Sequence, residues 1–496
     1  MVGKFITEFM NKYKDTGLTF DDVSLIPQYA DFLPSQADIR TKVAKDMTLN
    51  IPFISAAMDT VTEYRMAIEM AKMGGMGIIH KNLSSEEQAK NVGRVKHYLN
   101  GLIADPITFR ENQRVKDIIE EKKKHGYSFN GFPIVDDDDN LKGIITARDF
   151  KFLRNKNCRV KDAMTKKVIS APHSITINNA FEIMLKNRIG KLPIVKNSKL
   201  VGLYSFSDVK SIIEHMEPLY NRDKKHRLRV GAAIGPRDYQ RLELLYENDV
   251  DIVVIDTAHG HSKGVVEMTK YVKKKHPSLS VMAGNIGTED AARDLIKAGA
   301  DSVKAGIGPG SICTTRVITG IGVPQITAVY NCARAAKGFV PVVSDGGIRN
   351  SGDVPKALAA GASCVMMGST LAGTGESPGE KIIHEGRQYV VYRGMGSIEA
   401  MKTAAGSRER YAQYDVLNSD KLVPEGVEGL VPFAGSVEQV ISQFTGGLRS
   451  SLGYNGCKTI KELQKKSRMI KVTQAGVREA HPHDVKIIKE APNYRT

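Results

Sequence analysis

Residues 301–316 read DSVKAGIGPGSICTTR, a short β-branched run followed by a glycine-rich loop that carries one cysteine. Such a run is typical of a buried strand. Gly306, Gly308 and Gly310 allow the backbone to approach a ligand closely and to adopt positive φ without penalty. Cys313 is a candidate nucleophile, because exposed amide groups and partial exposure favour the thiolate. A buried, inert cysteine on a structural turn is an open alternative at this point, since free cysteines are often buried.

A strand followed by a helical segment occurs repeatedly on both sides of this stretch. Glycine closes several of the helices, as in Gly299-Ala300 and Gly361-Ala362. Eight strands with intervening helices predict a (β/α)8 barrel, whereas a doubly wound sheet, the alternative, would not need eight such units. The expected strands are Ile51–Ala56, Met76–His80, Val230–Ile234, Ile252–Asp256, Ser280–Asn285, Ser302–Gly306, Val340–Asp345 and Ser363–Gly368.

Between the second and third strands the chain repeats itself. Phe132–Val135 recurs as Leu192–Val195, and Leu141–Ile145 recurs as Leu200–Tyr204. A repeat of this kind indicates two copies of one α/β unit packed on each other. We therefore expect a barrel domain over residues 1–100 and 218–496, with an inserted module over 101–217 whose repeats span about 101–158 and 159–217.

Composition places the chain among ordinary globular proteins. Its 496 residues are 41% hydrophobic and 25% charged, which is enough chain for two or more domains with their own cores. No apolar run approaches the roughly 18 residues of a membrane span, and residues 1–15 lack the pattern of a signal or transit peptide. Five cysteines without a Cys-x-x-Cys pair indicate a reducing compartment. We expect a cytoplasmic protein that does not bind membranes.

The formal net charge of +16 raises the question of nucleic-acid binding. The lysines are dispersed, in runs such as Lys122–Lys124 and Lys273–Lys275 inside helix-like segments. No basic stripe interleaved with aromatic residues and no base-reading motif is present. A basic surface suited to phosphorylated small molecules is therefore expected, and nucleic acid is not.

In a (β/α)8 barrel the chemistry lies on the loops that follow the carboxyl ends of the strands. Gly346-Gly347 and Gly368-Ser369 follow the seventh and eighth strands, where this fold commonly binds phosphate, and they offer backbone amides and a hydroxyl. Ordinary tight turns are the alternative interpretation. Asp345 is placed to accept hydrogen bonds from ribose hydroxyls. The pair His259 and His261 suggests a metal hydrolase, but no matching ligands occur at the other strand ends, so a structural or cofactor-contacting loop is favoured.

Several of these motifs together resemble the IMP dehydrogenase family over essentially the whole chain. His481–Asp484 near the C-terminus resembles bacterial members, and residues 101–217 resemble a tandem pair of cystathionine-β-synthase-type (CBS) modules at that family's usual insertion point. The matching motifs are Asp256–His261, Gly306–Arg316, Ser344–Gly347, Met366–Ser369, Tyr392–Ser397 and Arg410-Tyr411.

The resemblance implies the reaction IMP + NAD⁺ + H₂O → XMP + NADH + H⁺, the committed step of guanine nucleotide synthesis. It assigns Cys313 as the nucleophile that forms a covalent thioimidate, which water then hydrolyses. Arg410 on a mobile flap, about residues 397–432, is the family's base, with Tyr411 beside it and Thr315 near the attacking water. Arginine is an unusual base because it normally stays protonated. Without the resemblance, residues 407–411 would be interpreted as a surface charge cluster in a flexible segment.

The resemblance also implies binding residues. The substrate residues are Ser311, Asp345, Gly346, Gly347, Gly368, Ser369, Tyr392, Arg393, Gly394, Met395, Gly396 and Glu425. The cofactor residues are Asp256, Asn285, Gly306, Ile307 and Gly308. No Gly-x-Gly-x-x-Gly motif follows the first strand, so a Rossmann half is not expected to hold NAD.

Family members are activated by K⁺, held by backbone carbonyls that correspond to Gly308, Gly310 and Cys313. Glu479, Ala480 and His481 of a neighbouring subunit would complete the site, and carbonyl oxygens suit this cation. Ala480 replaces a serine common in bacterial members, which matters little if its carbonyl is the ligand. A shared site implies a homotetramer, which CBS pairs can join into octamers, and CBS pairs commonly bind regulatory purine nucleotides.

Two alternatives compete with this interpretation. GMP reductases share the barrel, the glycine loop and the cysteine, but use NADPH for reductive deamination and usually lack both the CBS pair and the Arg-Tyr flap. A nucleotide-sensing or nucleic-acid-binding protein on the same scaffold is the other alternative. Cys313, Arg410 and the inserted module are all present, which favours the dehydrogenase.

Overall fold

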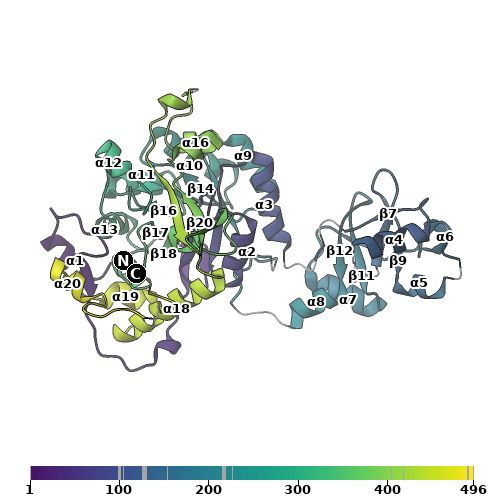
Figure 1. The fold of residues 1–496 in the computed structure, drawn as a ribbon, viewed down its shortest axis with the longest axis horizontal. Coiled ribbons are helices and arrows are strands. Elements are labelled where there is room, and N and C mark those ends of the chain that lie inside the picture. Colours follow the sequence, from purple (N-terminus) through teal and green to yellow (C-terminus); the bar gives the residue numbers. More distant parts are fainter. Residues whose placement is uncertain are drawn as a thin grey trace. The chain divides into compact units, whose positions relative to one another are not determined.

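Eight parallel strands close into a barrel in the computed structural model of the chain (Figure 1). Closure confirms the predicted (β/α)8 barrel and excludes the doubly wound sheet, which has two open edges. In order around the barrel the strands are β13 (Gly231–Ile234), β14 (Ile252–Asp256), β15 (Ser280–Ile286), β16 (Ser302–Ala305), β17 (Val342–Asp345), β18 (Cys364–Met367), β4 (Phe53–Ser55) and β5 (Met76–Ile79).

A helix follows each strand, as the sequence predicts. Two of them begin at side-chain caps: Ser84 Oγ accepts from the backbone of Glu87 at 3.1 Å, and Thr288 Oγ1 accepts from Ala291 at 3.3 Å. The helices that follow the strands are α2 (Tyr64–Lys72), α3 (Ser85–His97), α9 (Tyr239–Glu247), α10 (Lys263–Lys275), α11 (Glu289–Lys297), α12 (Thr315–Thr319), α13 (Gln325–Ala336), α14 (Asp353–Ala359) and α15 (Ser369–Ala372).

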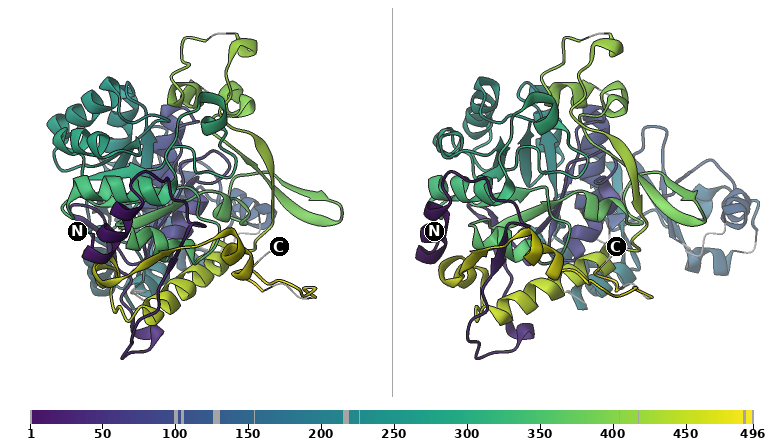
Figure 2. Two further views of the ribbon diagram at one scale, coloured as in Figure 1. Left: turned by 90° about the vertical axis from the view of Figure 1, so that its left-hand side faces the viewer. Right: turned by 60° about the vertical axis from the view of Figure 1, so that its left-hand side comes forward.

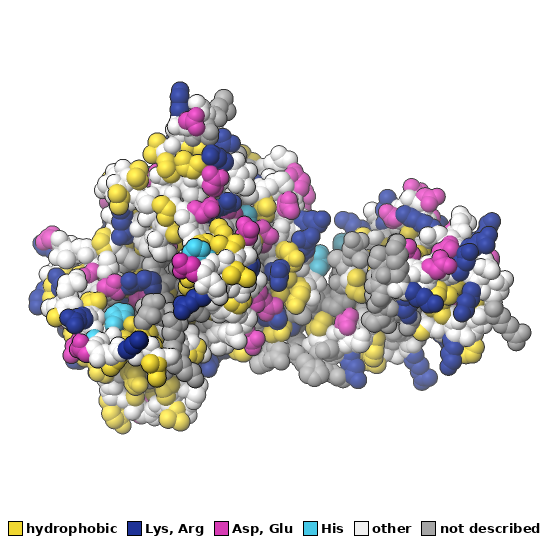
Figure 3. Space-filling model, viewed as in Figure 1, with side chains coloured by type: hydrophobic (Ala, Val, Ile, Leu, Met, Phe, Trp, Pro, Cys, Tyr) yellow, Lys and Arg dark blue, Asp and Glu magenta, His cyan; other side chains and the backbone are white. Residues whose placement is uncertain are grey.

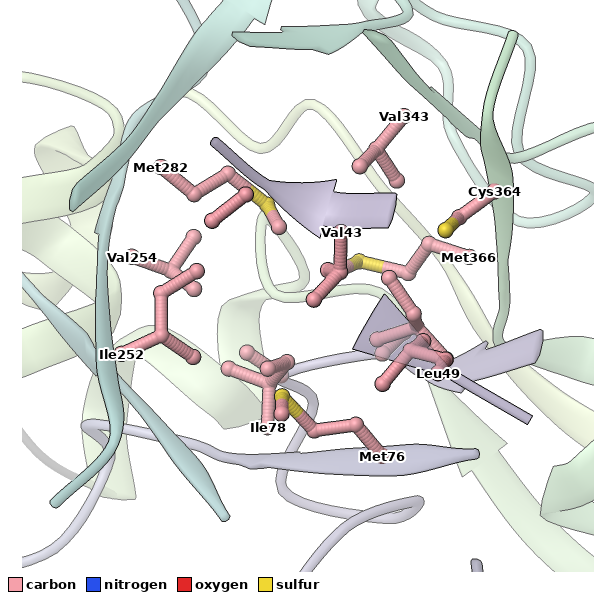
Figure 4. Packing of buried hydrophobic residues seen from close by; sticks show 14 of the residues in the cluster. Val43, Leu49, Met76, Ile78, Ile252, Val254, Met282, Val343, Cys364 and Met366 are labelled. Carbon is pink, nitrogen blue, oxygen red and sulfur yellow. The ribbon is translucent and has the colours of Figure 1, made fainter. Parts of the chain in front are cut away.

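A small hairpin fills the amino-terminal end of the barrel. Strands β2 (Thr41–Ala44) and β3 (Met47–Leu49) form it, and it is bonded to residues just before two barrel strands, through Lys45 N to Asp301 O and Thr41 Oγ1 to Ser363 O. Val43 and Leu49 point in among buried barrel side chains such as Ile78, Val254, Met282 and Met366 (Figure 4). The functional end of the barrel is therefore the opposite one, where the strands finish.

The chain divides into two compact units. Unit 1, the barrel, comprises residues 1–95, 219–221 and 228–496, and unit 2 comprises 96–218 and 222–227. The structure describes residues 2–98, 102–103, 106–125, 131–153, 155–214, 219–225, 227–403, 405–416, 418–488 and 491–494. The predicted domain boundaries at 100/101 and 217/218 lie outside the described residues.

Unit 2 holds two small sheets that share the element order strand, helix, strand, strand, helix. One sheet contains β7 (Phe109–Arg110), β8 (Gly131–Val135) and β9 (Leu141–Thr146), with α4 (Val115–His125), α5 (Ala147–Phe152) and α6 (Val160–Ala163). The other contains β10 (Ala171–Pro172), β11 (Lys191–Lys196), β12 (Lys199–Ser205) and β6 (Leu102–Ile103), with α7 (Ile177–Asn187) and α8 (Phe206–Glu214). Each sheet packs on its own apolar core.

Further segments of unit 1 surround the barrel. The three-stranded sheet of β19 (Lys381–His384), β20 (Arg387–Arg393) and β21 (Glu428–Pro432) projects from it, and α16 (Ile398–Thr403), α17 (Ala405–Arg410) and η2 (Ser419–Lys421) lie between β20 and β21 (Figure 2). The remaining elements are α1 (Lys4–Lys12), β1 (Val23–Leu25), η1 (Pro34–Gln36), α18 (Val437–Tyr454), α19 (Ile460–Lys466), β22 (Met469–Lys471) and α20 (Gln474–Glu479).

The surface is mixed in charge. On the face shown in Figure 3, lysine and arginine side chains are scattered among acidic ones over both units. The two lysine runs noted in the sequence do lie on helices, Lys122–Lys124 in α4 and Lys273–Lys275 in α10. Within the described ranges, no helix combines the length and apolarity that crossing a membrane requires.

Candidate active site

A cavity of about 320 Å³ opens at the carboxyl ends of the barrel strands. Parallel strands place their carboxyl ends at one edge, so Asp256, Asn285 and Asp345 meet there although they are far apart in the sequence. The predicted residues that line the cavity are Asp256, Asn285, Gly306, Gly308, Gly310, Ser311, Cys313, Thr315, Asp345, Gly346, Gly347, Gly368, Ser369, Tyr392, Gly394, Met395, Arg410, Tyr411 and Glu425.

Cys313 lies on the glycine loop, in a turn closed by its own backbone N–H and the carbonyl of Gly310 at 3.1 Å. Its side chain is half-buried, and Sγ lies 3.1 Å from Thr315 Oγ1. Three other cysteines are buried: burial raises the pKa of Cys332 to about 12, and it raises the pKa values of Cys364 and Cys457 too. Cys313 faces the cavity, so the alternative of an inert, buried cysteine does not describe it.

Backbone hydrogen bonds join the cysteine loop to a segment more than a hundred residues later. Thr314 N donates to Glu425 O at 3.0 Å, and Val427 N donates to Ile312 O at 3.0 Å. Glu425 N in turn donates to Gly396 O at 3.0 Å. Residues 425–427 therefore hold the cysteine loop against the loop after β20, which closes one wall of the cavity.

The end of α17 brings Arg410 and Tyr411 into the cavity. The Arg410 side chain is only 15% exposed and forms an ion pair with Asp256, while its carbonyl accepts from Ala258 N at 3.0 Å. Burial raises the pKa of Tyr411, so this phenol is protonated at neutral pH and can donate a hydrogen bond. The sequence alone favours an exposed charge cluster here, and that interpretation is wrong: helix α17 turns both side chains toward the barrel.

Lys304 is the ion-pairing centre of the site. It projects from the end of β16 with its side chain 2% exposed, and Nζ lies 2.8 Å from Asp256 Oδ1 and 2.7 Å from Asp345 Oδ2. Nζ also donates to Asn285 Oδ1, and Asn285 Nδ2 donates to Asp345 Oδ2 at 2.9 Å. One buried cation therefore compensates two carboxylates that would otherwise repel each other in a medium of low polarity.

The opposite side of the cavity is rich in backbone and hydroxyl groups. Gly346 and Gly347 have φ of +88° and +79°, a region that only glycine enters without penalty. Helix α15 begins at Ser369 directly after β18, so its amino end faces the same space. Arg349 lines this side and adds a guanidinium. The site can therefore accept an anionic group there.

Six predicted residues lie outside the cavity lining. The Ile307 carbonyl accepts from Arg316 Nε at 2.9 Å, Arg393 forms an ion pair with Asp59 at 2.7 Å, and Gly396 contacts the flap next to Tyr411. Glu479 ends α20, Ala480 follows it, and His483 Nδ1 lies 2.9 Å from the carbonyl oxygen of His481.

Several lining residues were not predicted. Lys304 could have been identified from the sequence, because a lysine inside a β-branched buried strand needs acidic partners. Gln325 had none: its Nε2 donates to Ala305 O at 2.9 Å and Ser344 Oγ at 3.0 Å, contacts that depend on the fold. The other unpredicted residues include Thr19, Phe20, Asp21, Met58, Pro309, Arg316 and Arg349.

His259 and His261 of the His-x-His motif do not belong to a group of metal ligands within the described residues. Both side chains are exposed, and His261 Nε2 lies 2.9 Å from Asp294 Oδ2. Across the described part of the chain, no group of three or more His, Cys, Asp or Glu side chains is arranged to hold a metal ion.

Comparison with known proteins places these features in a family. Residues 17–483 match the model of the IMP dehydrogenase / GMP reductase domain. Relatives named inosine-5′-monophosphate dehydrogenase include one from Halalkalibacterium halodurans, 51% identical over 98% of this chain and 99% of that protein. Another, from Bacillus subtilis, is 48% identical over 98% of this chain and 99% of its own length.

A solved structure of a related enzyme is also similar. It is a GMP reductase from Trypanosoma brucei in complex with guanosine 5′-monophosphate, with a TM-score of 0.80 and 37% identity, covering 95% of this chain and 98% of that one. A match of that coverage must include most of unit 2, so an inserted module does not by itself separate the two activities. The higher identity and nearly complete coverage of the dehydrogenases separate them better. The chain belongs to the IMP dehydrogenase / GMP reductase family, among the IMP dehydrogenases.

Proposed function

We propose that this enzyme oxidises IMP to XMP with NAD⁺ and water, releasing NADH and a proton. One observation carries the proposal: Cys313 and the flap residues Arg410 and Tyr411 line the same cavity as the glycine turns at Gly346-Gly347 and Gly368-Ser369. A thiol nucleophile, a site for an anion and a group to handle water are what this reaction needs in one place.

In the first half of the reaction the Cys313 thiolate adds to C2 of the purine, forming a C–S bond. The C2 hydrogen then leaves with its electron pair, and NAD⁺ when bound accepts it as a hydride. A covalent thioimidate remains on Cys313. The anion-accepting side of the cavity, with Ser311, Ser369 and Arg349, holds the phosphate so that C2 faces Sγ.

In the second half, water attacks the thioimidate carbon and the C–S bond breaks to release XMP. Thr315 Oγ1, 3.1 Å from Sγ, positions this water. Arg410 first passes a guanidinium proton to its paired Asp256 carboxylate, and the neutral side chain then takes the proton of the attacking water. The protonated Tyr411 phenol donates a hydrogen bond beside the guanidinium.

Cofactor and flap use the same carboxylate. Asp256 is assigned to the nicotinamide side, and it is also the partner of Arg410. The two therefore exclude each other, and the order follows: hydride transfer occurs with the flap displaced, NADH leaves, and the flap then enters for hydrolysis.

A K⁺ site fits the backbone of the cysteine loop. Its ligands would be the backbone carbonyls of Gly308, which has φ of +74°, of Gly310, which also accepts from Cys313 N, and of Cys313, because carbonyl oxygens suit this cation. Residues 479–481 stand at the C-terminal end of α20, where carbonyls lack helical partners. Supplied by a neighbouring subunit, they would complete the site.

Quaternary structure and regulation follow the same proposal. A site shared between subunits requires an oligomer, a homotetramer that unit 2 can join into octamers. The repeated sheets of unit 2 support its assignment as a CBS pair, with purine nucleotides as its ligands. Free thiols at all five cysteines support a cytoplasmic enzyme. The scattered positive charge supports small anionic ligands rather than nucleic acid.

The proposal is tested by following NADH absorbance with IMP, NAD⁺ and K⁺. Wild type should produce NADH, whereas Cys313→Ala should produce none and Cys158→Ser, a control in unit 2, should match wild type. Replacing K⁺ with Na⁺ should lower the rate. Consumption of NADPH with GMP, and no activity with IMP, would establish a reductase instead.

A further inference from the structure

A buried ion pair joins the flap to the barrel next to Arg410. Lys81 follows β5, its side chain is 4% exposed, and Nζ bonds to Oε2 of Glu409, the residue that precedes Arg410. Asp238, in the loop after β13, lies 3.9 Å away. Burial lowers the pKa of Lys81, as expected for an ammonium removed from water. None of the steps above uses this lysine.

The partners of Asp238 show that Glu409 is the principal acceptor. Asp238 Oδ2 accepts from Gly235 N at 2.7 Å and lies 3.3 Å from Arg241 Nε, so the barrel already satisfies it. Glu409 is the acidic group that comes from the flap. When the flap leaves, Lys81 loses that partner and keeps only a distant, shared one, and a buried charge without a close partner is costly.

Two glycines leave room for this contact. A Cβ on Gly235 would overlap the Glu409 carboxylate and stand 2.5 Å from Lys81 Nζ. A Cβ on Gly406, in α17, would stand 2.5 Å from the backbone oxygen of Lys81. Backbone and side chain of the flap are thus fitted closely around one lysine.

Neighbouring contacts fix the same part of the flap. Asn82 Nδ2 donates to Ala400 O at 3.2 Å, and Asn82 Oδ1 accepts from Ser407 N at 3.3 Å. Further along, Arg237 lies over the Tyr414 ring at 4.7 Å. Residues 81–82 therefore hold α17 at the strand ends, with Arg410 directed to Asp256.

We propose that Lys81 and Glu409 are positioning residues that hold the flap closed. Their ion pair sets the equilibrium between the open flap, which admits NAD⁺, and the closed flap, which carries out hydrolysis. The inference rests on the proposed function. Weakening the pair should slow hydrolysis, because Arg410 is less often in place. It should also lower the KM for NAD⁺, because the cofactor then competes with a looser flap.

The test uses the full-length enzyme with Glu409→Gln, Lys81→Met and the double variant Lys81→Met/Glu409→Leu. Rapid mixing with IMP and NAD⁺ separates a burst of NADH from hydride transfer and the slower steady state from hydrolysis. A hydrogen bond to a charged group is worth about tenfold or more in an equilibrium constant. Glu409→Gln and Lys81→Met should therefore lower the steady-state rate about tenfold and leave the burst unchanged.

Two readouts separate positioning from general damage. The KM for NAD⁺ should fall in both single variants, whereas damage to the site would raise it. The double variant should be no slower than the slower single one, because removing both partners of a buried pair leaves no unpaired charge. Glu399→Gln in α16 is the matched control, since its pair with Lys402 at 3.4 Å is exposed, and it should behave as wild type.

The chain has no tryptophan, so a background variant Tyr414→Trp gives one fluorophore on the flap. Its emission should move toward that of an exposed indole in Lys81→Met and not in Glu399→Gln. Unchanged steady-state rate and KM in Glu409→Gln and Lys81→Met would overturn the inference. If wild type forms no NADH from IMP, the proposed function fails, and the fluorescence comparison still reports on the ion pair.

Discussion

Lys304 is the single side chain on which the geometry of the site most depends. Its ammonium group is out of contact with water and lies between Asp256 and Asp345, which we assign to cofactor and substrate respectively. That cation compensates both carboxylates and fixes their orientation, together with Arg410 at Asp256 and Asn285 at Asp345. The residue thus acts on both ligands without being a nucleophile or base.

Replacing Lys304 with Met should therefore lower the free energy of unfolding substantially. Asp345 then loses its ion pair while Asp256 keeps the one with Arg410, and removing one partner of a buried pair costs about 3–5 kcal/mol. Urea unfolding should report a loss of that order, together with weaker binding of IMP and NAD⁺. Lys297→Met, at an exposed position of α11, is the control. Equal unfolding free energies for the two variants would contradict the role given to Lys304.

Replacing Gly306 has two effects, the cost of positive φ and the overlap of the added Cβ with a neighbour, and a comparison with Gly320 separates them. Its φ is +153°, and a Cβ there would overlap the carbonyl oxygen of Asp345. Gly320 also has positive φ, +71°, but has nothing within 4 Å of the added atom. Gly320→Ala should cost only about 1 kcal/mol.

Gly306→Ala should cost more than Gly320→Ala and should abolish NADH formation, because it displaces Asp345. Thermal unfolding and the IMP-dependent rate measure the two effects separately. A Gly306→Ala enzyme as active as Gly320→Ala would show that the close approach at Asp345 is not needed.

For single residues, the sequence predicts which side chains take part in the reaction better than it predicts which side chains contact each other. Cys313 follows a predicted strand and Asp345 ends one, so their positions make both of them candidates for the site. Gln325, whose Nε2 contacts Ser344, could not be predicted, because its role depends on how α13 lies against the barrel. Assigning Arg410 required the family resemblance, since its sequence neighbourhood indicates only solvent exposure.

Among the elements, the strands of the barrel were the easiest to predict and the segments after β18 the hardest. Most barrel strands are short apolar runs followed by a glycine, as at Gly235, Gly306, Gly346 and Gly368, and that pattern recurs. The hairpin β2–β3, with strands of four and three residues, was not predicted, because it lies outside the repeating alternation of strand and helix that marks the barrel strands. Helix α17 contacts Lys81 through Glu409 and Asn82 through Ser407, and these contacts between distant residues cannot be predicted from the sequence.

A single carbon atom added at Gly396 should displace the flap. A Cβ on Gly396 would stand 2.7 Å from the Tyr411 ring. Gly396→Ala should therefore push the flap outward and lower the hydrolysis rate about tenfold, on the order of a lost charge-assisted contact. The NADH burst should persist. Gly429→Ala in β21, where the added atom meets nothing within 4 Å, should match wild type.

At the scale of the whole molecule, the two units have separate cores. Unit 1 is held by the barrel cluster, and unit 2 by two clusters of its own, one for each sheet. Lys96 and Asp223, both in unit 2 near its two connections, form an ion pair at 2.9 Å. The barrel therefore does not need unit 2 to complete its core.

Replacing residues 102–214 with a short glycine-serine linker should give a folded, active barrel. Calorimetry of the full chain should show a transition that the shortened chain lacks, and IMP-dependent NADH formation should stay within about twofold, because no cavity-lining residue is removed. Loss of the remaining transition would contradict the independence of unit 1.

The central claim is that IMP becomes covalently attached to Cys313 during oxidation. The most direct measurement is the intact mass of protein quenched in acid during turnover with IMP and NAD⁺. We predict a nucleotide adduct that maps to the peptide containing Cys313, requires NAD⁺, and is absent from Cys313→Ala. NADH formation by Cys313→Ala, or turnover by wild type with no adduct at that peptide, would contradict the account.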